Sequence, residues 1–407
     1  FYLYVVIILD WFFFFFQIQK LGGYMPITLT DDIYQTNLIV IAILIAVVLF
    51  TFRRAKHTDL FPVSVTQELK GLGILTVVFA HFAYMLVTNA DFLFPLSIIA
   101  GVGVDLFLFM SGYGLTVGML KKPLPALEFY KRRVIKIFIP FWVAIILIFA
   151  ANAIFLDITY PMSYMIRSLL GWFPTAIGFD DVNSPFWYIT WMMMFYALFP
   201  LVFSSKRPWL SAIILSVIAT LIGVYNPLDM GDNWLHRLHT VAFSLGIVFA
   251  WLLFETKDKE NKLVKTLKHF RNEAKVMPLV VIALMLVVVV YMSLHTTSSS
   301  WPTLTAILGQ GFFVDQLTSL VIMFAFIVIF SLKKFDNKFF AIYGLYSFEV
   351  YLIHWPLIGR YDIFFDILPA WAAVVAWIIS FILISWLLQK ITTPLGALVD
   401  KLLAPKN

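Results

Sequence analysis

Apolar runs of about twenty residues, separated by shorter polar segments, recur along the chain. A helix needs about that many residues to cross the hydrocarbon core of a bilayer, whereas barrel strands are half as long and alternate in polarity. Helices are also favoured because each unsatisfied backbone amide in hydrocarbon costs several kcal/mol. The pattern predicts twelve spans, over 1–19, 35–52, 69–88, 96–118, 134–156, 187–204, 209–224, 238–254, 276–294, 311–331, 339–359 and 369–389.

The distribution of Lys and Arg tests this count, because cytoplasmic loops carry an excess of both. Alternate loops of the predicted topology hold 25 of the 29 basic residues on one side and four on the other. One miscounted span would disturb that alternation. The chain is therefore predicted to be a multi-pass protein of the cell membrane, with both termini in the cytoplasm. The span over 1–19 is the least regular, because it contains Asp10 and a run of five Phe.

The composition supports a lipid environment for most of the chain. Of its 407 residues, 62% are hydrophobic and 13% are charged, which is too apolar for a soluble protein of this size. The net charge of +6 is spread over alternate loops and gives no nucleic-acid patch. With no cysteine, disulfides, thiolate metal sites and cysteine nucleophiles are excluded. We predict an all-α polytopic transmembrane bundle that contacts the lipid bilayer, binds no nucleic acid and holds no metal; its oligomeric state is unknown.

Ionisable residues inside the predicted spans are candidates for function, because each costs a few kcal/mol to insert. If its helix enters the membrane near Leu69, His81 lies about 18 Å along a core of about 30 Å. Lys70 precedes it by eleven residues, so both share one helix face at opposite depths. This spacing suits a channel with a basic mouth. The alternative is a neutral histidine that only bonds a neighbouring helix.

Asp105 and Ser111 lie in a glycine-rich segment between Gly101 and Gly114. Glycines there would let a neighbouring helix or a ligand approach closely. A carboxylate at Asp105 could orient an imidazole or take a proton from a hydroxyl group. An ion pair or hydrogen bond across a helix interface is the alternative.

Four cations stand at the start of the span predicted over 134–156: Lys131, Arg132, Arg133 and Lys136. Guanidinium groups at this depth would suit phosphates that enter from the cytosol. The tendency of cytoplasmic loops to be basic explains the same residues equally well. Near the C-terminus, His354 lies in Tyr351-Leu-Ile-His354-Trp-Pro356, toward the outer surface, where an interfacial histidine is the simpler interpretation. Glu349 has no evident partner.

In this order and topology, these segments resemble the acyltransferase-3 family of membrane proteins, which move acyl groups, usually acetyl, onto bacterial glycans. One family motif is a basic residue followed, after ten intervening residues, by a histidine. Lys70 and His81 have this spacing. The family's Gly-Val-Asp-Leu-Phe-Phe followed by Ser-Gly-Phe is similar to Gly103 through Phe107 and Ser111 through Tyr113, with Tyr in place of the last Phe. Its Tyr-Leu-Ile-His-Trp-Pro matches 351–356 without change.

Two other family elements are only partly kept. The Arg-x-x-Arg associated with the acyl-CoA donor corresponds to Arg133 and Lys136. The planar guanidinium group of the second Arg is therefore replaced by the compact ammonium group of a Lys. The element that starts with Trp-Ser-Leu and continues with paired acids and Phe-Tyr is similar to 186–196, which includes Trp187, but the acids are absent.

The resemblance implies a ten-helix acyltransferase core over 65–391, preceded by an N-terminal addition of one or two helices over 1–64 and followed by a short cytoplasmic tail over 392–407. It implies a membrane O-acyltransferase that moves an acyl group, expected to be acetyl, from cytosolic acyl-CoA to a hydroxyl of a cell-surface glycan or glycan precursor.

The resemblance also implies roles for single residues. The CoA phosphates would contact a basic set: Lys70, Lys131, Arg132, Arg133 and Lys136. His81 would be the general base or a transient acyl carrier, with Asp105 holding its tautomer and Ser111 stabilising the oxyanion. His354, Tyr351 and Trp187 would lie on the acceptor side.

A transporter or flippase for a glycan precursor is the main alternative, because twelve spans with charges near the midplane also describe secondary carriers. Turnover of acyl-CoA by purified protein would distinguish the two. A membrane sensor or scaffold would need a soluble output domain, and no segment of the sequence is long enough to form one. Two segments are interpreted as selecting the acceptor, because the predicted topology places them on the non-cytoplasmic side. They are the loop over 157–186 and the stretch around His236, Arg237 and His239.

Overall fold

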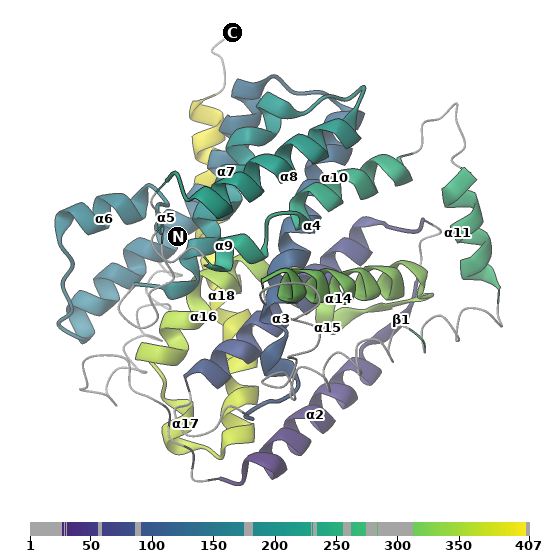
Figure 1. Ribbon diagram of the computed structural model, residues 1–407. Coiled ribbons are helices and arrows are strands. Elements are labelled where there is room, and N and C mark those ends of the chain that lie inside the picture. The colour runs from purple at the N-terminus through teal and green to yellow at the C-terminus, as the bar shows by residue number, and fades with distance from the viewer. Residues whose placement is uncertain are drawn as a thin grey trace.

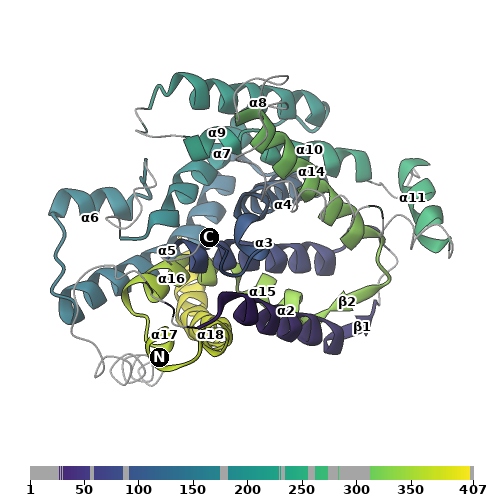
Figure 2. The same cartoon turned by 60° about the horizontal axis from the view of Figure 1, so that its bottom comes forward.

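The chain folds into long helices packed side by side, with one short two-stranded ribbon (Figures 1 and 2). The computed structural model describes residues 31–55, 59–85, 91–174, 182–228, 234–254, 262–273 and 312–403, together with the single residues 27, 29, 230 and 283. In this part of the chain, eight helices are long and apolar enough to cross a membrane, and Gln316–Leu332 is a shorter apolar helix. The predicted all-α polytopic bundle is therefore confirmed. The span predicted over 1–19 and, apart from residue 283, that over 276–294 lie outside the described residues.

The long helices are α2 (Ile33–Phe50), α3 (Val63–Tyr84), α4 (Ala100–Lys121), α5 (Ala126–Phe155), α7 (Trp187–Val202), α8 (Pro208–Tyr225), α10 (Ala242–Leu253), α14 (Phe312–Leu332), α16 (Ser347–Arg360) and α18 (Ala370–Leu402). Shorter helices connect them: η1 (Leu96–Ile98), α6 (Met162–Leu169), η2 (Ser184–Phe186), α9 (Trp234–Leu238), α11 (Lys262–Asn272), α15 (Lys338–Leu345) and α17 (Phe364–Ile367). Strands β1 (Phe52–Arg54) and β2 (Phe335–Asn337) pair antiparallel, with Phe52 opposite Asn337.

The predicted and observed boundaries differ most clearly in three places. The single span expected over 339–359 is wrong, because α15 and α16 are separate helices that meet at Tyr346. Helix α5 begins at Ala126, so the predicted cation cluster is itself helical. Helix α18 continues through 392–402, where a tail was expected. Hydrophobic periodicity cannot detect a one-residue break inside an apolar run, and it ends a helix where the polar residues begin.

Glycines bring the backbones of α3, α4 and α10 into direct contact. A Cβ atom on Gly103 would collide with the carbonyl oxygen of Gly73 and the hydroxyl of Thr76. A Cβ atom on Gly112 would collide with the carbonyl oxygen of Phe243, and one on Gly246 with that of Phe109. Small residues permit such approach in membrane helices. Helix α4, which carries Asp105 and Ser111, is thereby held against α3 on one side and α10 on another.

We expect the Gly112→Ala substitution to destabilise the protein by about 1–3 kcal/mol, because the added methyl group meets a backbone carbonyl that cannot rotate away. Gly118→Ala is the matched control on the same helix, since a Cβ there has no neighbour within 4 Å. It should be neutral or slightly stabilising, because alanine is the better helix former. Thermal unfolding in detergent micelles would measure both changes; equal midpoints for the two variants would refute the close approach.

A buried ion pair joins α3 to the end of α14. Lys333 Nζ lies 2.5 Å from Glu68 Oε2, and the two side chains are 5% and 1% exposed. The other carboxylate oxygen of Glu68 accepts a hydrogen bond from the backbone nitrogen of Asn337, at 3.0 Å. Lys333 Nζ also donates to the carbonyl oxygen of Phe335 in β2, at 2.7 Å. The pair thus fastens the ribbon to the helix that carries Lys70 and His81.

Candidate active site

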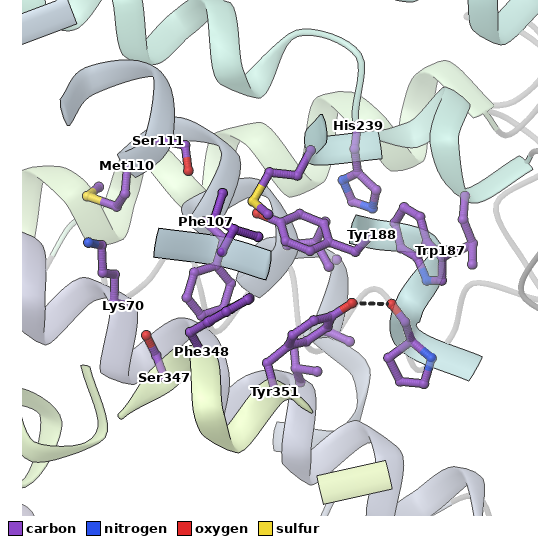
Figure 3. A pocket seen from close by; sticks show the side chains of 18 of the residues that line it. Lys70, Phe107, Met110, Ser111, Trp187, Tyr188, His239, Ser347, Phe348 and Tyr351 are labelled. Atoms are coloured by element: carbon purple, nitrogen blue, oxygen red, sulfur yellow. Dashed lines mark hydrogen bonds between the residues drawn. The ribbon is translucent and has the colours of Figure 1, made fainter. Parts of the chain in front are cut away.

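A cavity of about 740 Å³ lies inside the bundle, between α3, α4, α5, α7 and α16 (Figure 3). Lys70 and His81 both line it, from positions eleven residues apart on α3, which is about 16 Å along a helix. Figure 3 shows Lys70, Met110 and Ser111 at one side, with His239 and Trp187 at the other. We call these the basic end, marked by Lys70, and the histidine end, marked by His239. His81 is assigned to the histidine end because it lines the cavity eleven residues away from Lys70 on α3.

Three cations converge on the basic end of the cavity: Lys70 from α3, and Arg133 and Lys136 from α5. Nε of Arg133 is buried and has no hydrogen-bond partner among the described residues. A buried donor without an acceptor is rare in folded proteins, and a bound anion would satisfy it. Close by, the hydroxyl of Tyr196 donates to Oγ of Ser111, at 3.1 Å. The basic end therefore combines positive charge, an unpaired guanidinium donor and hydroxyl groups.

Two of the predicted cations do not reach the cavity. Lys131 Nζ donates to the carbonyl oxygen of Leu403, at 3.1 Å, and lies 3.5 Å from Oδ1 of Asp400. Arg132 Nε donates to Oε1 of Glu128, at 2.7 Å, on the exposed side of α5. Residues three apart share a helix face and adjacent residues do not. The expectation that all the predicted cations form one site is thus corrected: 133 and 136 face the cavity, and 131 and 132 face away.

At the histidine end, two imidazole rings contact one another. His81 Nδ1 lies 2.7 Å from His354 Nε2, with the ring planes 3° apart. Nδ1 of His354 lies 3.0 Å from the carbonyl oxygens of both Val350 and Tyr351. His354 is fully buried and does not line the cavity. Its expected place on the acceptor side is therefore corrected, because it lies behind His81.

The hydrogen bonds of this pair define a tautomer. A carbonyl oxygen can only accept, so Nδ1 of His354 carries a proton. In the neutral pair, Nε2 of His354 is then the acceptor, and Nδ1 of His81 donates to it. Nε2 of His81 is left with a free lone pair, and no described residue hydrogen-bonds to it. His81 can therefore act as a base or as a nucleophile toward a group in the cavity.

Asp105 does not contact His81, contrary to the sequence-based expectation. Its Oδ1 lies 2.7 Å from Nδ1 of His239, and its Oδ2 accepts a hydrogen bond from Oγ of Ser319, at 2.5 Å. The side chain of Asp105 is fully buried and that of His239 is 3% exposed. His354 holds the tautomer of His81 in the place that Asp105 was expected to fill. The physical reason is that Asp105 faces the chain between α9 and α10, a contact that helical spacing alone does not reveal.

Ser111, Tyr351 and Trp187 line the cavity at different levels. Ser111 lies at the basic end with Lys70 (Figure 3), so the expected oxyanion role beside His81 does not fit its position. Tyr351 donates its hydroxyl to the carbonyl oxygen of Pro185, at 2.6 Å, which ties α16 to η2. The indole of Trp187 stacks on His239, with centroids 5.9 Å apart and planes at 21°.

His239 and Ser319 are site residues whose roles the sequence did not reveal. His239 had been singled out only as acceptor-selecting, and Ser319 not at all. Each lies in a stretch with several other polar residues, 236–240 and 315–319, so only the contact with Asp105 distinguishes them. Glu349, whose partner the sequence did not show, receives a hydrogen bond from Nε2 of Gln389 at 3.3 Å and does not line the cavity.

The chain matches a known protein family. The model of a family described as an acyltransferase domain covers residues 69–390, which is most of the chain. No curated protein and no solved structure matches. The matched range includes every residue that lines the cavity.

Proposed function

Because the chain belongs to the acyltransferase-3 family and is a membrane acyltransferase, we propose that it transfers an acyl group, expected to be acetyl, from acyl-CoA to a hydroxyl group of a glycan or glycan precursor. The cavity carries this proposal, because it joins a cluster of cations to a histidine with a free ring nitrogen. That combination suits a donor with a phosphorylated end and a distant reactive thioester.

The donor would bind with its phosphates at the basic end. Lys70, Arg133 and Lys136 supply the positive charge, and the buried Nε of Arg133 needs an acceptor. Charge-assisted hydrogen bonds from guanidinium to phosphate are strong and directional. Phosphates are too polar to move along the apolar part of the cavity, so only the flexible thioester arm would extend toward His81.

His81 would act on the reacting groups at the other end. The lone pair on Nε2 is free, because the hydrogen bond to His354 holds the ring proton on Nδ1. Trp355 packs edge-on against His81, with centroids 4.8 Å apart, and holds the plane of the ring. Ordered orientation of this kind is what a catalytic base or acyl-accepting group needs.

The acceptor would enter at the histidine end, where the cavity wall is aromatic. Trp187 stacks on His239, and Tyr188 and Tyr351 also line the cavity. Flat apolar rings with a few polar groups are typical of small-ligand sites. A glycan acceptor rests on the family resemblance, and a cytosolic donor on the predicted topology.

We expect Arg133→Ala to raise the KM for acetyl-CoA about tenfold to a hundredfold, since a hydrogen bond to a charged group contributes about 1.5–3 kcal/mol. Arg132→Ala is the matched control, because the neighbouring guanidinium points away and pairs with Glu128. It should leave the KM unchanged. Thiol release from acetyl-CoA by protein in nanodiscs, with crude cell-envelope glycan as acceptor, would measure both.

Equal effects of the two substitutions would refute the donor site. Absence of thiol release by folded wild-type protein, with several envelope fractions as acceptor, would refute the proposed transfer and favour the transporter or flippase.

A further inference from the structure

A second histidine faces the cavity, and unlike His81 it is backed by a carboxylate. His239 lies between α9 and α10, and its Nδ1 is 2.7 Å from Oδ1 of Asp105 in α4. Ser319 in α14 donates to the other carboxylate oxygen, at 2.5 Å. The three residues come from separate parts of the chain, and His239 lines the cavity together with His81.

We infer that His239, oriented by Asp105, is the general base that takes the proton from the acceptor hydroxyl group. This inference rests on the proposed acyl transfer and divides it between two histidines. His239 is the catalytic residue, because it would touch the acceptor. Asp105 and Ser319 are positioning residues, because they act through it.

The hydrogen bonds hold the ring in a useful orientation. A carboxylate accepts only, so Nδ1 of His239 donates to Asp105 and Nε2 keeps its lone pair. Ser319 occupies the second oxygen of Asp105, so the carboxylate cannot turn away. Trp187 stacks on the imidazole, and Nε1 of Trp191 donates to the backbone carbonyl of His239, at 3.1 Å. Both the ring and the backbone of His239 are therefore held in place.

Charge favours His239 over His81 as the group that receives the proton. When an imidazole takes a proton it becomes a cation, and a buried cation needs a nearby anion. His239 has the Asp105 carboxylate at hydrogen-bond distance. His81 contacts a neutral imidazole in His354, and no described carboxylate is hydrogen-bonded to either ring. Proton transfer to His239 thus creates an ion pair, whereas transfer to His81 creates an isolated charge.

The proposed transfer converts the thioester of the donor into an ester of the acceptor. The O–H bond of the acceptor breaks, its proton moves to Nε2 of His239, and the oxygen forms a bond to the acyl carbon. The carbon–sulfur bond of the thioester breaks, and sulfur leaves with the electron pair. The thiolate takes up the proton that His239 gives back, so the products are an ester and a free thiol. His81 remains available to act on the acyl group itself.

A nucleophile that needs no base separates the two roles. Hydroxylamine attacks through a nitrogen lone pair and loses its proton afterwards, so it should bypass His239 but still use the donor site and His81. The experiment uses the full chain in nanodiscs with acetyl-CoA and compares crude cell-envelope glycan with hydroxylamine, after subtraction of the uncatalysed reaction. The variants are His239→Gln, which keeps a polar side chain of similar length but has no basic nitrogen, and Asp105→Asn. His236→Gln is the matched control: the sequence predicted an acceptor-selecting role for His236, but this residue is as buried as His239 and does not line the cavity.

We expect His239→Gln to lower the kcat for glycan acylation about 10²- to 10⁴-fold, the usual contribution of a general base, and to leave hydroxylamine transfer within about threefold of wild type. Asp105→Asn should change the ratio of the two rates in the same direction, which a merely structural role would not do. His236→Gln should leave the ratio unchanged.

Two results would overturn the inference: glycan acylation by His239→Gln near the wild-type rate, or loss of hydroxylamine transfer in the same proportion as glycan transfer. Binding of acetyl-CoA to each variant confirms that the cavity is intact. If His239→Gln does not bind acetyl-CoA, the same two criteria are applied to Asp105→Asn to test the inference. Wild-type protein that acylates neither acceptor would instead overturn the proposed function, and this inference with it.

Discussion

The His81→Asn variant is expected to lose acyl transfer by about 10²- to 10⁴-fold or more, since it removes a ring nitrogen in contact with the reacting groups. Asparagine can still donate a hydrogen bond to Nε2 of His354, so the packing behind the site is kept. It has no counterpart to the free lone pair on Nε2 of His81. The loss should appear in kcat for both glycan and hydroxylamine, with the KM for acetyl-CoA little changed.

His269→Asn is the control for this substitution, because His269 is exposed on α11 and does not line the cavity. It should keep the wild-type rate. Full activity in a correctly folded His81→Asn variant would contradict the assignment of His81, whatever the fate of His239.

The second large effect concerns stability. We expect Lys333→Met to destabilise the protein by about 3–5 kcal/mol, because it leaves the carboxylate of Glu68 buried without its cation. The double variant Glu68→Gln, Lys333→Met removes both charges and should recover most of this loss, since a neutral pair needs no compensation. Denaturant-induced unfolding in mixed micelles would measure the three proteins. A double variant no more stable than Lys333→Met would contradict the explanation.

Much of the helical architecture could be predicted from the sequence, because the bilayer sets the length of an apolar run. The long helices α2, α3, α4, α5, α7, α8 and α10 each overlap one predicted span. The break between α15 and α16 at Tyr346 could not be predicted, because it lies inside a continuous apolar run. Nor could the close packing of α15 on α3, where a Cβ on Gly344 would collide with the carbonyl oxygen of Gln67. Local patterns carry no record of such tertiary contacts.

The same distinction holds for the site. Lys70 and His81 share a helix, so their common face followed from helical geometry, and both line the cavity. Helical spacing also explains why Arg132 turns away while Arg133 does not. The partner of Asp105 lies 134 residues away in His239, and that of His81 lies 273 residues away in His354. Pairs so distant in sequence are defined only by the folded bundle.

The most direct test of the proposed transfer follows the acyl group itself. Purified protein in nanodiscs would receive acetyl-CoA labelled in the acetyl group, with crude cell-envelope glycan as acceptor, and the glycan would be recovered and treated with mild alkali. We predict label in the glycan, released by alkali as expected for an O-ester, with one free thiol formed for each acetyl transferred. Unlabelled glycan and intact acetyl-CoA, with folded wild-type protein, would contradict the account.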